Sequence, residues 1–158
     1  MSVRTIKVML AMLVVSGSLW AADNPLIGAW KINLAKTKYT AGTPPKNQVI
    51  TYTMVGDALK LTAEIDNAQG HQTNTYTAKY DGKDYPFNST AKDAVAGQTV
   101  RLKRIDANTT ERTTYFKGKQ IGTVTEVVSK DGKTLMRTQK GVNVQGQPVD
   151  NVQVLDKQ

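Results

Sequence analysis

Apolar and polar residues alternate with a period of two along most of this chain. In the stretch 59–66, Leu, Leu, Ala and Ile alternate with Lys, Thr, Glu and Asp. Successive side chains of a β-strand point to opposite faces, so this pattern predicts strands with one buried and one solvated face. No segment after residue 22 shows an apolar stripe at the 3.6-residue period of a helix. The sequence therefore predicts an all-β protein.

The predicted strands follow one another at a spacing of roughly 8–12 residues, with turn-forming residues between them. Several turns carry residue pairs typical of tight hairpins: Gly56-Asp57, Asp81-Gly82 and Asp131-Gly132. Short connections make sequence neighbours into sheet neighbours, and closing such a meander removes its two exposed edges. We therefore expect an antiparallel up-and-down barrel of about 8–10 strands. The one long irregular stretch, 86–97, is expected to form a loop or a short helical turn over one end.

Residues 1–22 have the composition of a secretory signal. Arg4 and Lys7 precede an apolar run, and Ala21 and Ala22 close the segment with small residues. The run is shorter than the roughly 20 residues of a membrane span, although an uncleaved anchor or a buried helix is the alternative. We therefore expect a signal peptide at 1–22 and one barrel domain at 23–158. The mature protein would be periplasmic or secreted, without stable insertion into a membrane.

Composition limits how the fold is held and what it binds. The chain has no cysteine, which excludes disulfides and a lipoprotein anchor. The formal charge is +8, or +6 once the two cations of the signal are removed. Lysines recur singly at turns and strand ends, as is usual for a soluble sheet protein, and the densest cluster is Arg101, Lys103 and Arg104. This distribution argues against a nucleic-acid site.

The chain has few groups suited to catalysis or metal binding. His71 is the only histidine, and with no cysteine it cannot build a usual zinc or copper site. The only serines after residue 22, Ser89 and Ser129, lie in loop and strand-end positions, which disfavours a Ser-His-Asp hydrolase. No glycine-rich phosphate loop is present. We expect neither a metal, nor a cofactor, nor an enzymatic activity.

The stretch NPLIGAWKINLAKTKY contains the first strand of the predicted barrel, which must pair with the last. Alternation points Trp30 and Ile32 inward and their neighbours outward. Gly28, without a side chain, lets the chain bend sharply as it enters the barrel floor. The indole of Trp30 would then plug the closed end.

The segment GAW at the head of a strand meander resembles the lipocalin and fatty-acid-binding (calycin) superfamily. More closely, GAWKINLAKTKY, YTAKYDGKDYP, LKRIDANT and VVSKDGKTL are similar to small exported bacterial lipocalin-like proteins of unassigned function. The resemblance implies a barrel that binds a small molecule, without naming a ligand. It also implies a late arginine that packs across the tryptophan, for which Arg137 is the candidate. The Thr-Asp-Tyr motif, terminal helix and disulfide of many lipocalins are missing.

Aromatic residues supply the candidate ligand site. Five residues on predicted strands could combine apolar surface with hydroxyl groups inside the barrel: Tyr52, Met54, Tyr76, Tyr80 and Phe116. A mostly apolar pocket with a few polar groups is the usual form of a small-molecule site. The alternative is that these residues are ordinary core, because small barrels are often filled by their own side chains.

Arg112 is the candidate polar anchor. Taking Gly118-Lys119 as a two-residue turn fixes the pairing of the flanking strands: Phe116 with Ile121, Thr114 with Thr123, Arg112 with Thr125, and Glu111 with Glu126. If Phe116 marks the inner face, Arg112 also points inward and needs an anionic partner, from the protein or from a ligand. The alternative, an Arg112 on the solvated face, stays open. In the fatty-acid-binding branch inward arginine and tyrosine hold a carboxylate, although the Arg-x-Tyr spacing is not matched here.

These observations predict an exported, non-enzymatic protein that binds a small, partly apolar or carboxylate-bearing ligand inside a barrel. The main alternative is a solid-barrel envelope or extracellular interaction protein with no small ligand. An inward charge beside tyrosines favours the first, and a filled interior with an exposed apolar patch favours the second. A barrel enzyme is the third alternative.

Overall fold

The computed structural model describes residues 24–40, 43–142 and 146–158. The predicted signal at 1–22 lies outside the described residues. Ten strands make up the fold: β1 (Gly28–Ile32), β2 (Asn47–Val55), β3 (Ala58–Asn67), β4 (Gly70–Ala78), β5 (Tyr85–Ser89), β6 (Gln98–Arg104), β7 (Thr109–Phe116), β8 (Lys119–Val128), β9 (Thr134–Val142) and β10 (Pro148–Lys157). No helix of the described part of the chain is long and apolar enough to cross a membrane.

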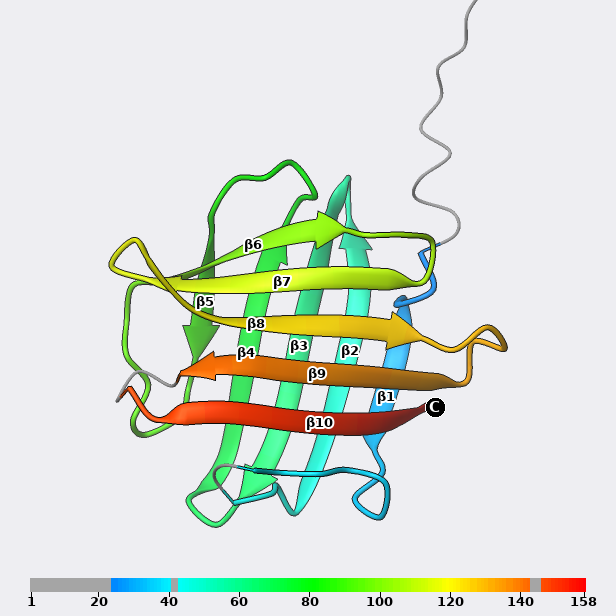
Figure 1. The fold of residues 1–158 in the computed structure, drawn as a ribbon, viewed down its shortest axis with the longest axis horizontal. Coiled ribbons are helices and arrows are strands. Elements are labelled where there is room, and N and C mark those ends of the chain that lie inside the picture. Colours follow the sequence, from blue (N-terminus) through cyan, green and yellow to red (C-terminus); the bar gives the residue numbers. More distant parts are fainter. Residues whose placement is uncertain (1–23, 41–42, 143–145) are drawn as a thin grey trace, which may run out of the picture.

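The strands form one closed antiparallel barrel in which each pairs with its neighbours in sequence, and β1 pairs with β10. Trp30 of β1 lies between Ile50 of β2 and Lys157 of β10, so the first strand closes the barrel. In Figure 1, β2, β3 and β4 run across the direction of β6–β10, so that two walls face each other. The predicted all-β fold, an antiparallel up-and-down barrel of about 8–10 strands, is confirmed.

Side-chain alternation puts the expected residues in the core. Trp30 and Ile32 are buried, and Lys31 between them is exposed. The inner faces of β2, β3 and β4 supply most of the remaining large buried groups: Ile50, Tyr52, Leu59, Leu61 and Tyr76. Fully burying each large apolar side chain contributes roughly 1.5–3 kcal/mol, and no disulfide is available to add to it.

The stretch 86–97 differs from its expected form, because its beginning belongs to β5. Tyr85 and Phe87 are partly buried against the core while Pro86 between them is exposed, which is strand alternation that the proline concealed. β5 is a weak link, since it pairs with β4 through three residues and with β6 through two. Residues 90–97 form the connection to β6.

The β7–β8 hairpin corrects the predicted pairing by at least one residue. The turn is Lys117-Gly118, whose φ angles of 50° and 73° are the two positive values that a tight hairpin favours. A β-bulge between Thr114 and Tyr115 shifts the register again. The observed pairs are Phe116 with Lys119, Thr114 with Gly122, Arg112 with Val124, and Glu111 with Thr125. The expected contact of Glu111 with Glu126 is therefore absent from the ladder.

Gly141 is held in a place that no side chain can occupy. Its φ is 139°, and a Cβ there would lie 2.4 Å from the carbonyl oxygen of Ile121 and 2.5 Å from Cα of Gly122. We expect Gly141→Ala to lower the free energy of unfolding by about 3 kcal/mol or more, from backbone strain and the clash together. Gly118→Ala is the matched control, because its φ is positive but its surroundings are open. Its expected cost is about 1–2 kcal/mol, and equal urea midpoints for the two variants would contradict the clash.

Candidate functional site

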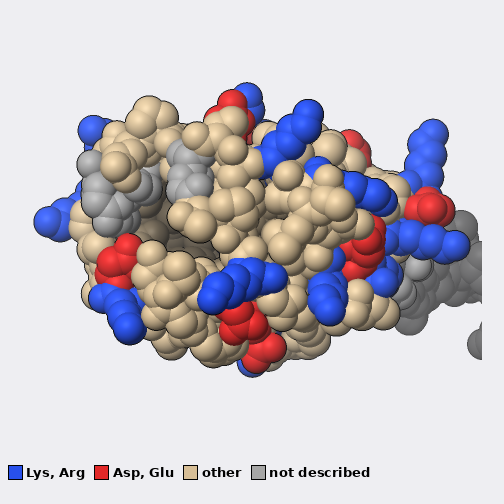
Figure 2. All heavy atoms as spheres, turned by 90° about the horizontal axis from the view of Figure 1, so that it is seen from below, with Lys and Arg blue, Asp and Glu red and all other residues tan. Residues whose placement is uncertain are grey.

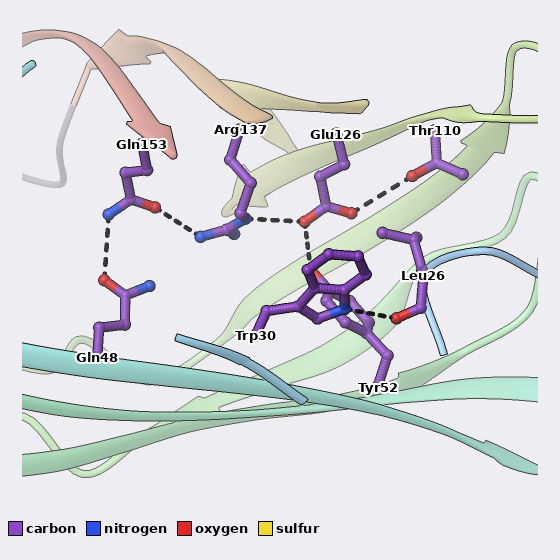
Figure 3. Close-up of polar contacts among 8 residues, drawn as sticks. All are labelled: Leu26, Trp30, Gln48, Tyr52, Thr110, Glu126, Arg137 and Gln153. Atoms are coloured by element: carbon purple, nitrogen blue, oxygen red, sulfur yellow. Dashed lines mark hydrogen bonds and ion pairs between the residues drawn. The ribbon is translucent and has the colours of Figure 1, made fainter. Parts of the chain in front are cut away.

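A buried ion pair lies at the centre of the barrel. Arg137 of β9 donates from Nε to Oε1 of Glu126 on β8 over 3.0 Å. The Tyr52 hydroxyl, from β2 on the other wall, donates to the same oxygen over 2.5 Å. The Thr110 hydroxyl donates to the second carboxylate oxygen over 3.3 Å (Figure 3). Glu126 thus joins the two walls of the barrel through its carboxylate.

The contacts continue from Arg137 toward one end of the barrel. Arg137 Nη1 donates to Oε1 of Gln153 on β10 over 2.7 Å, and Gln153 Nε2 donates to Oε1 of Gln48 on β2 over 3.1 Å. Gln153 also donates to the hydroxyl of Tyr39, in the connection between β1 and β2. Figure 3 shows this chain of side chains crossing from β10 to β2. The central ion pair therefore also fixes the β1–β2 connection.

Burial makes this pair interdependent. The side chains of Glu126 and Arg137 are 2% and 9% exposed, and charges removed from water in this way need each other. Burial opposes the charge of Arg137, but Tyr52 and Glu126 outweigh it and raise the pKa of the guanidinium. Burial, and then the charge of Glu126, raise the pKa of the Tyr52 hydroxyl well above its ordinary value. Both groups are thus committed to contacts within the protein.

Trp30 closes the barrel floor, but not with the arginine that the family resemblance implied. Its indole is fully buried, and Nε1 donates to the carbonyl oxygen of Leu26 over 2.8 Å (Figure 3). The cation over its ring is Lys157 Nζ, 5.0 Å from the ring centroid. Arg137 pairs with Glu126 instead, which corrects the expected contact. Gly28 has a φ of 128°, which favours glycine, and a Cβ at this position would lie 3.1 Å from Cε of the Lys157 side chain.

The lumen on one side of the ion pair contains two adjoining cavities of about 290 and 310 Å³. They share the lining residues Phe87, Arg112 and Gln139. The first extends to the β1–β2 connection, and Leu61, Ala63 and Ile65 of β3 supply its apolar wall. Figure 2 views this end of the molecule and shows a hollow with uncharged residues beside it. The interior of the described structure therefore contains space beside Phe87, Arg112 and Gln139.

Arg112 points into this lumen. Its ladder partners Leu102 and Val124 are both buried, so all three side chains face inward. The guanidinium carbon lies 5.7 and 5.8 Å from the ring centroids of Tyr76 and Phe87. Nε is buried without a hydrogen-bond partner, and no carboxylate of the described residues lies within ion-pair distance of this side chain. Arg112 is thus an inward cation without a counter-charge.

Two further polar atoms beside Arg112 also lack partners. The Tyr76 hydroxyl and Asn74 Oδ1 are buried and make no hydrogen bond within the described structure. Burial, and then the charge of Glu126, raise the pKa of Tyr76, while Arg112 lowers it in part, so Tyr76 stays a neutral donor. Buried polar groups are normally satisfied, and each exception needs a reason. These atoms offer a donor, a hydroxyl and an acceptor.

The remaining predicted site residues do not join this group. Met54 and Tyr80 border a different cavity at the other end of the barrel. Phe116 lies at the β7–β8 turn with Lys117 Nζ 5.3 Å from its ring centroid, and it lines neither lumen cavity. The ligand role of all these residues stays a prediction. Among the described residues no group of His, Cys, Asp or Glu is placed to hold a metal ion.

Sequence reasoning missed Glu126, Asn74 and Phe87 as interior residues. Glu126 lies between Val124 and Val128 in alternation, which places it on the apolar face of its strand. Asn74 alternates with Tyr76 in the same way. The alternation of both residues with buried neighbours could have predicted their inward positions. Polar residues in an alternating pattern, however, are normally assigned to the solvated face.

The ion pair makes a clear stability prediction. Glu126→Gln leaves the Arg137 charge buried and unpaired, and should lower the free energy of unfolding by about 3–5 kcal/mol. Tyr52→Phe removes one hydrogen bond and should cost only about 1–2 kcal/mol. Urea denaturation measures both. A combined Glu126→Gln, Arg137→Met variant should recover part of the loss, and a double variant worse than Glu126→Gln would argue against interdependence.

Tyr52 predicts a loss of stability in alkali. Its pKa is higher in the folded than in the unfolded state, so its contribution is complete below about pH 10 and is lost as the pH rises through the folded pKa. We expect the free energy of unfolding to fall from about pH 10 upward, by up to about 1.4 kcal/mol per pH unit for each such tyrosine. Denaturation at increasing pH, with absorbance at the tyrosinate band, measures it. Tyr52→Phe should flatten the slope, and an unchanged slope would contradict the assignment.

The sequence matches no protein-family model and no curated protein. Among solved structures, a Schistosoma mansoni fatty acid binding protein in complex with arachidonic acid has a TM-score of 0.58 at 12% identity, covering 86% of this chain and 98% of that one. A zebrafish ileal bile acid-binding protein complexed with cholic acid has a TM-score of 0.51 at 15% identity, covering 85% and 99%. At these identities the likeness shows the fold alone. This chain has the ten-strand calycin-like barrel of fatty-acid-binding proteins, and the neighbours are binding proteins rather than enzymes.

Proposed function

We propose that this protein is an exported, non-enzymatic binder of a small, partly apolar molecule that carries an acid group, with Arg112 as its anchor. The observation that carries the proposal is the guanidinium of Arg112, which faces the lumen without a protein carboxylate. A second interior arginine, Arg137, forms an ion pair with the carboxylate of Glu126. The contrast singles out Arg112 as the cation left for a ligand.

The surroundings of Arg112 suit the rest of such a ligand. Tyr76 and Asn74 provide additional polar atoms, and Phe87, Leu61 and Ile65 provide apolar surface. The combination of apolar walls with a few convergent polar groups is typical of small-molecule pockets, whose volumes are about 300–1,000 Å³. One of the two adjoining cavities lies at the lower end of this range and the other just below it, and together they weigh against a solid barrel.

The structural neighbours and the amino-terminal sequence support the same proposal. Each neighbour was solved with an organic acid, arachidonic acid in one and cholic acid in the other. Residues 1–22 support export, since they combine two cations, an apolar run and small closing residues. Native mass spectrometry of the mature protein from its own host would identify a ligand retained during purification.

Arg112 should select for an acid group. We expect the mature protein to bind dodecanoate at least about tenfold more tightly than dodecanol, because a charge-assisted hydrogen bond contributes about 1.5–3 kcal/mol. Arg112→Gln should remove this preference by weakening dodecanoate alone. Calorimetric titration of both ligands measures it.

Lys140→Gln is the control, because Lys140 is exposed, pairs with Asp150 and lines none of these cavities, so it should leave both affinities unchanged. Equal binding of acid and alcohol by the unmodified protein would overturn the role of Arg112. The proposed function would be overturned if neither dodecanoate, nor dodecanol, nor a wider panel of apolar acids binds.

A further inference from the structure

A third cavity, of about 680 Å³, lies at the opposite end of the barrel from the lumen mouth. The β2–β3 turn and the β4–β5 turn form one side of it, and β6 forms the other. It shares no lining residue with the two lumen cavities. Along β2, Tyr52 lies between Gln48 of the lumen and Met54 of this cavity. Tyr76 of β4 likewise lies between Asn74 of the lumen and Tyr80, which follows β4 and lines this cavity. The fully buried tyrosines therefore separate the two spaces.

An open strand edge explains why this cavity exists. β6 pairs with β7 along its whole length, but β5 reaches it only at Thr99 and Val100. The edge of residues 101–104 that faces away from β7 has no partner among the described strands. The cavity follows this edge, which is why inward Leu102 and outward Lys103 both line it. Such an edge presents backbone N–H and C=O groups that a bound molecule can use.

The floor of the third cavity favours an aromatic body. Met54, Leu102 and the ring of Tyr80 supply its apolar surface. A methionine sulfur and a tyrosine ring both make favourable contacts with aromatic rings. The Tyr80 hydroxyl is buried without a hydrogen bond of good geometry; burial raises its pKa, and nearby Asn24 lowers it in part. It therefore remains a neutral group at the base of the cavity.

The rim of the third cavity has an excess of positive charge. Four cations and two carboxylates line it: Lys79, Arg101, Lys103, Arg104, Asp57 and Asp81. Both carboxylates are engaged, Asp57 with Lys79 at 2.9 Å and Asp81 with the Tyr85 hydroxyl at 2.8 Å. Within the described chain, Lys103 and Arg104 have no carboxylate at ion-pair distance.

We propose that this cavity is a second binding site, for a small aromatic anion. The aromatic body lies on Met54, Leu102 and Tyr80, and the carboxylate or sulfonate group meets Lys103 and Arg104. The site is independent of the proposed function, because it uses none of the residues around Arg112. A peptide strand added to the β6 edge is the competing occupant, but only residues 101–104 are unpaired, which is short for strand addition.

Methionine methyl groups provide a direct test, because the chain after residue 22 has only Met54 and Met136. Met54 lines the cavity, whereas Met136 is 42% exposed on the outer face of β9 and serves as the internal reference. We expect the probe anilinonaphthalene sulfonate to shift the Met54 methyl resonance and to leave that of Met136 in place. Uncharged phenylnaphthylamine should bind at least about tenfold more weakly at Met54, because it lacks the charged group.

Variants separate this site from the lumen. Lys103→Gln and the double variant Lys103→Gln, Arg104→Gln should weaken the effect of the sulfonate on Met54, by about tenfold for the double variant. The single variant guards against a folding defect, since Arg104 also donates to carbonyls of the β6–β7 turn. Arg112→Gln should leave the Met54 response unchanged.

A Met54 methyl that does not respond at a saturating probe concentration would overturn the second site, as would equal affinity for charged and uncharged probes. If the probe shifts only the lumen-lining Ile65 methyl, it binds in the lumen alone. That result would refute the second site while leaving the proposed function intact. If the unmodified protein does not bind dodecanoate but its Met54 methyl responds to the probe, the proposed function is refuted and the second site is supported.

Discussion

The Glu126–Arg137 ion pair is the contact on which the interior of this barrel depends. It joins β8 to β9, and through Tyr52 and Gln153 it reaches β2 and β10. The residues around it cannot be exchanged singly, because each substitution removes a partner from a buried charge. In a chain without disulfides, a cross-barrel contact of this kind sets the spacing of the two walls.

This pair also determines what the rest of the interior can do. Glu126 satisfies Arg137, so the second inward arginine, Arg112, has no carboxylate of the protein left to it. The buried layer of Tyr52 and Tyr76 divides the space into a lumen that contains Arg112 and a separate cavity beside the edge of β6. One connected core thus produces two spaces with different cations and different walls.

The sequence predicted the features that depend on alternation and closure. Period-two patterning gave the all-β class, and the position of Trp30 gave the closing strand. The predicted register of β7 and β8 was wrong. The observed register depends on a positive φ at Lys117, which a lysine does not indicate, and on a bulge for which the sequence has no pattern. The inward position of Glu126 was missed because a carboxylate is normally assigned to the solvated face. Its burial is stabilised by Arg137, which comes from another strand.

Arg112 shows how strongly the proposed binding site differs from its surroundings. A leucine or methionine there would pack on Phe87 and Tyr76 without the cost of desolvating a charge. Three of the four buried polar atoms that lack a partner in the described structure, Arg112 Nε, the Tyr76 hydroxyl and Asn74 Oδ1, lie close together at this lumen. Local departures from the rules of stability are expected where a protein binds something, because the missing partner then comes from the ligand. The arrangement is unfavourable for an empty barrel and favourable for one that holds an acid.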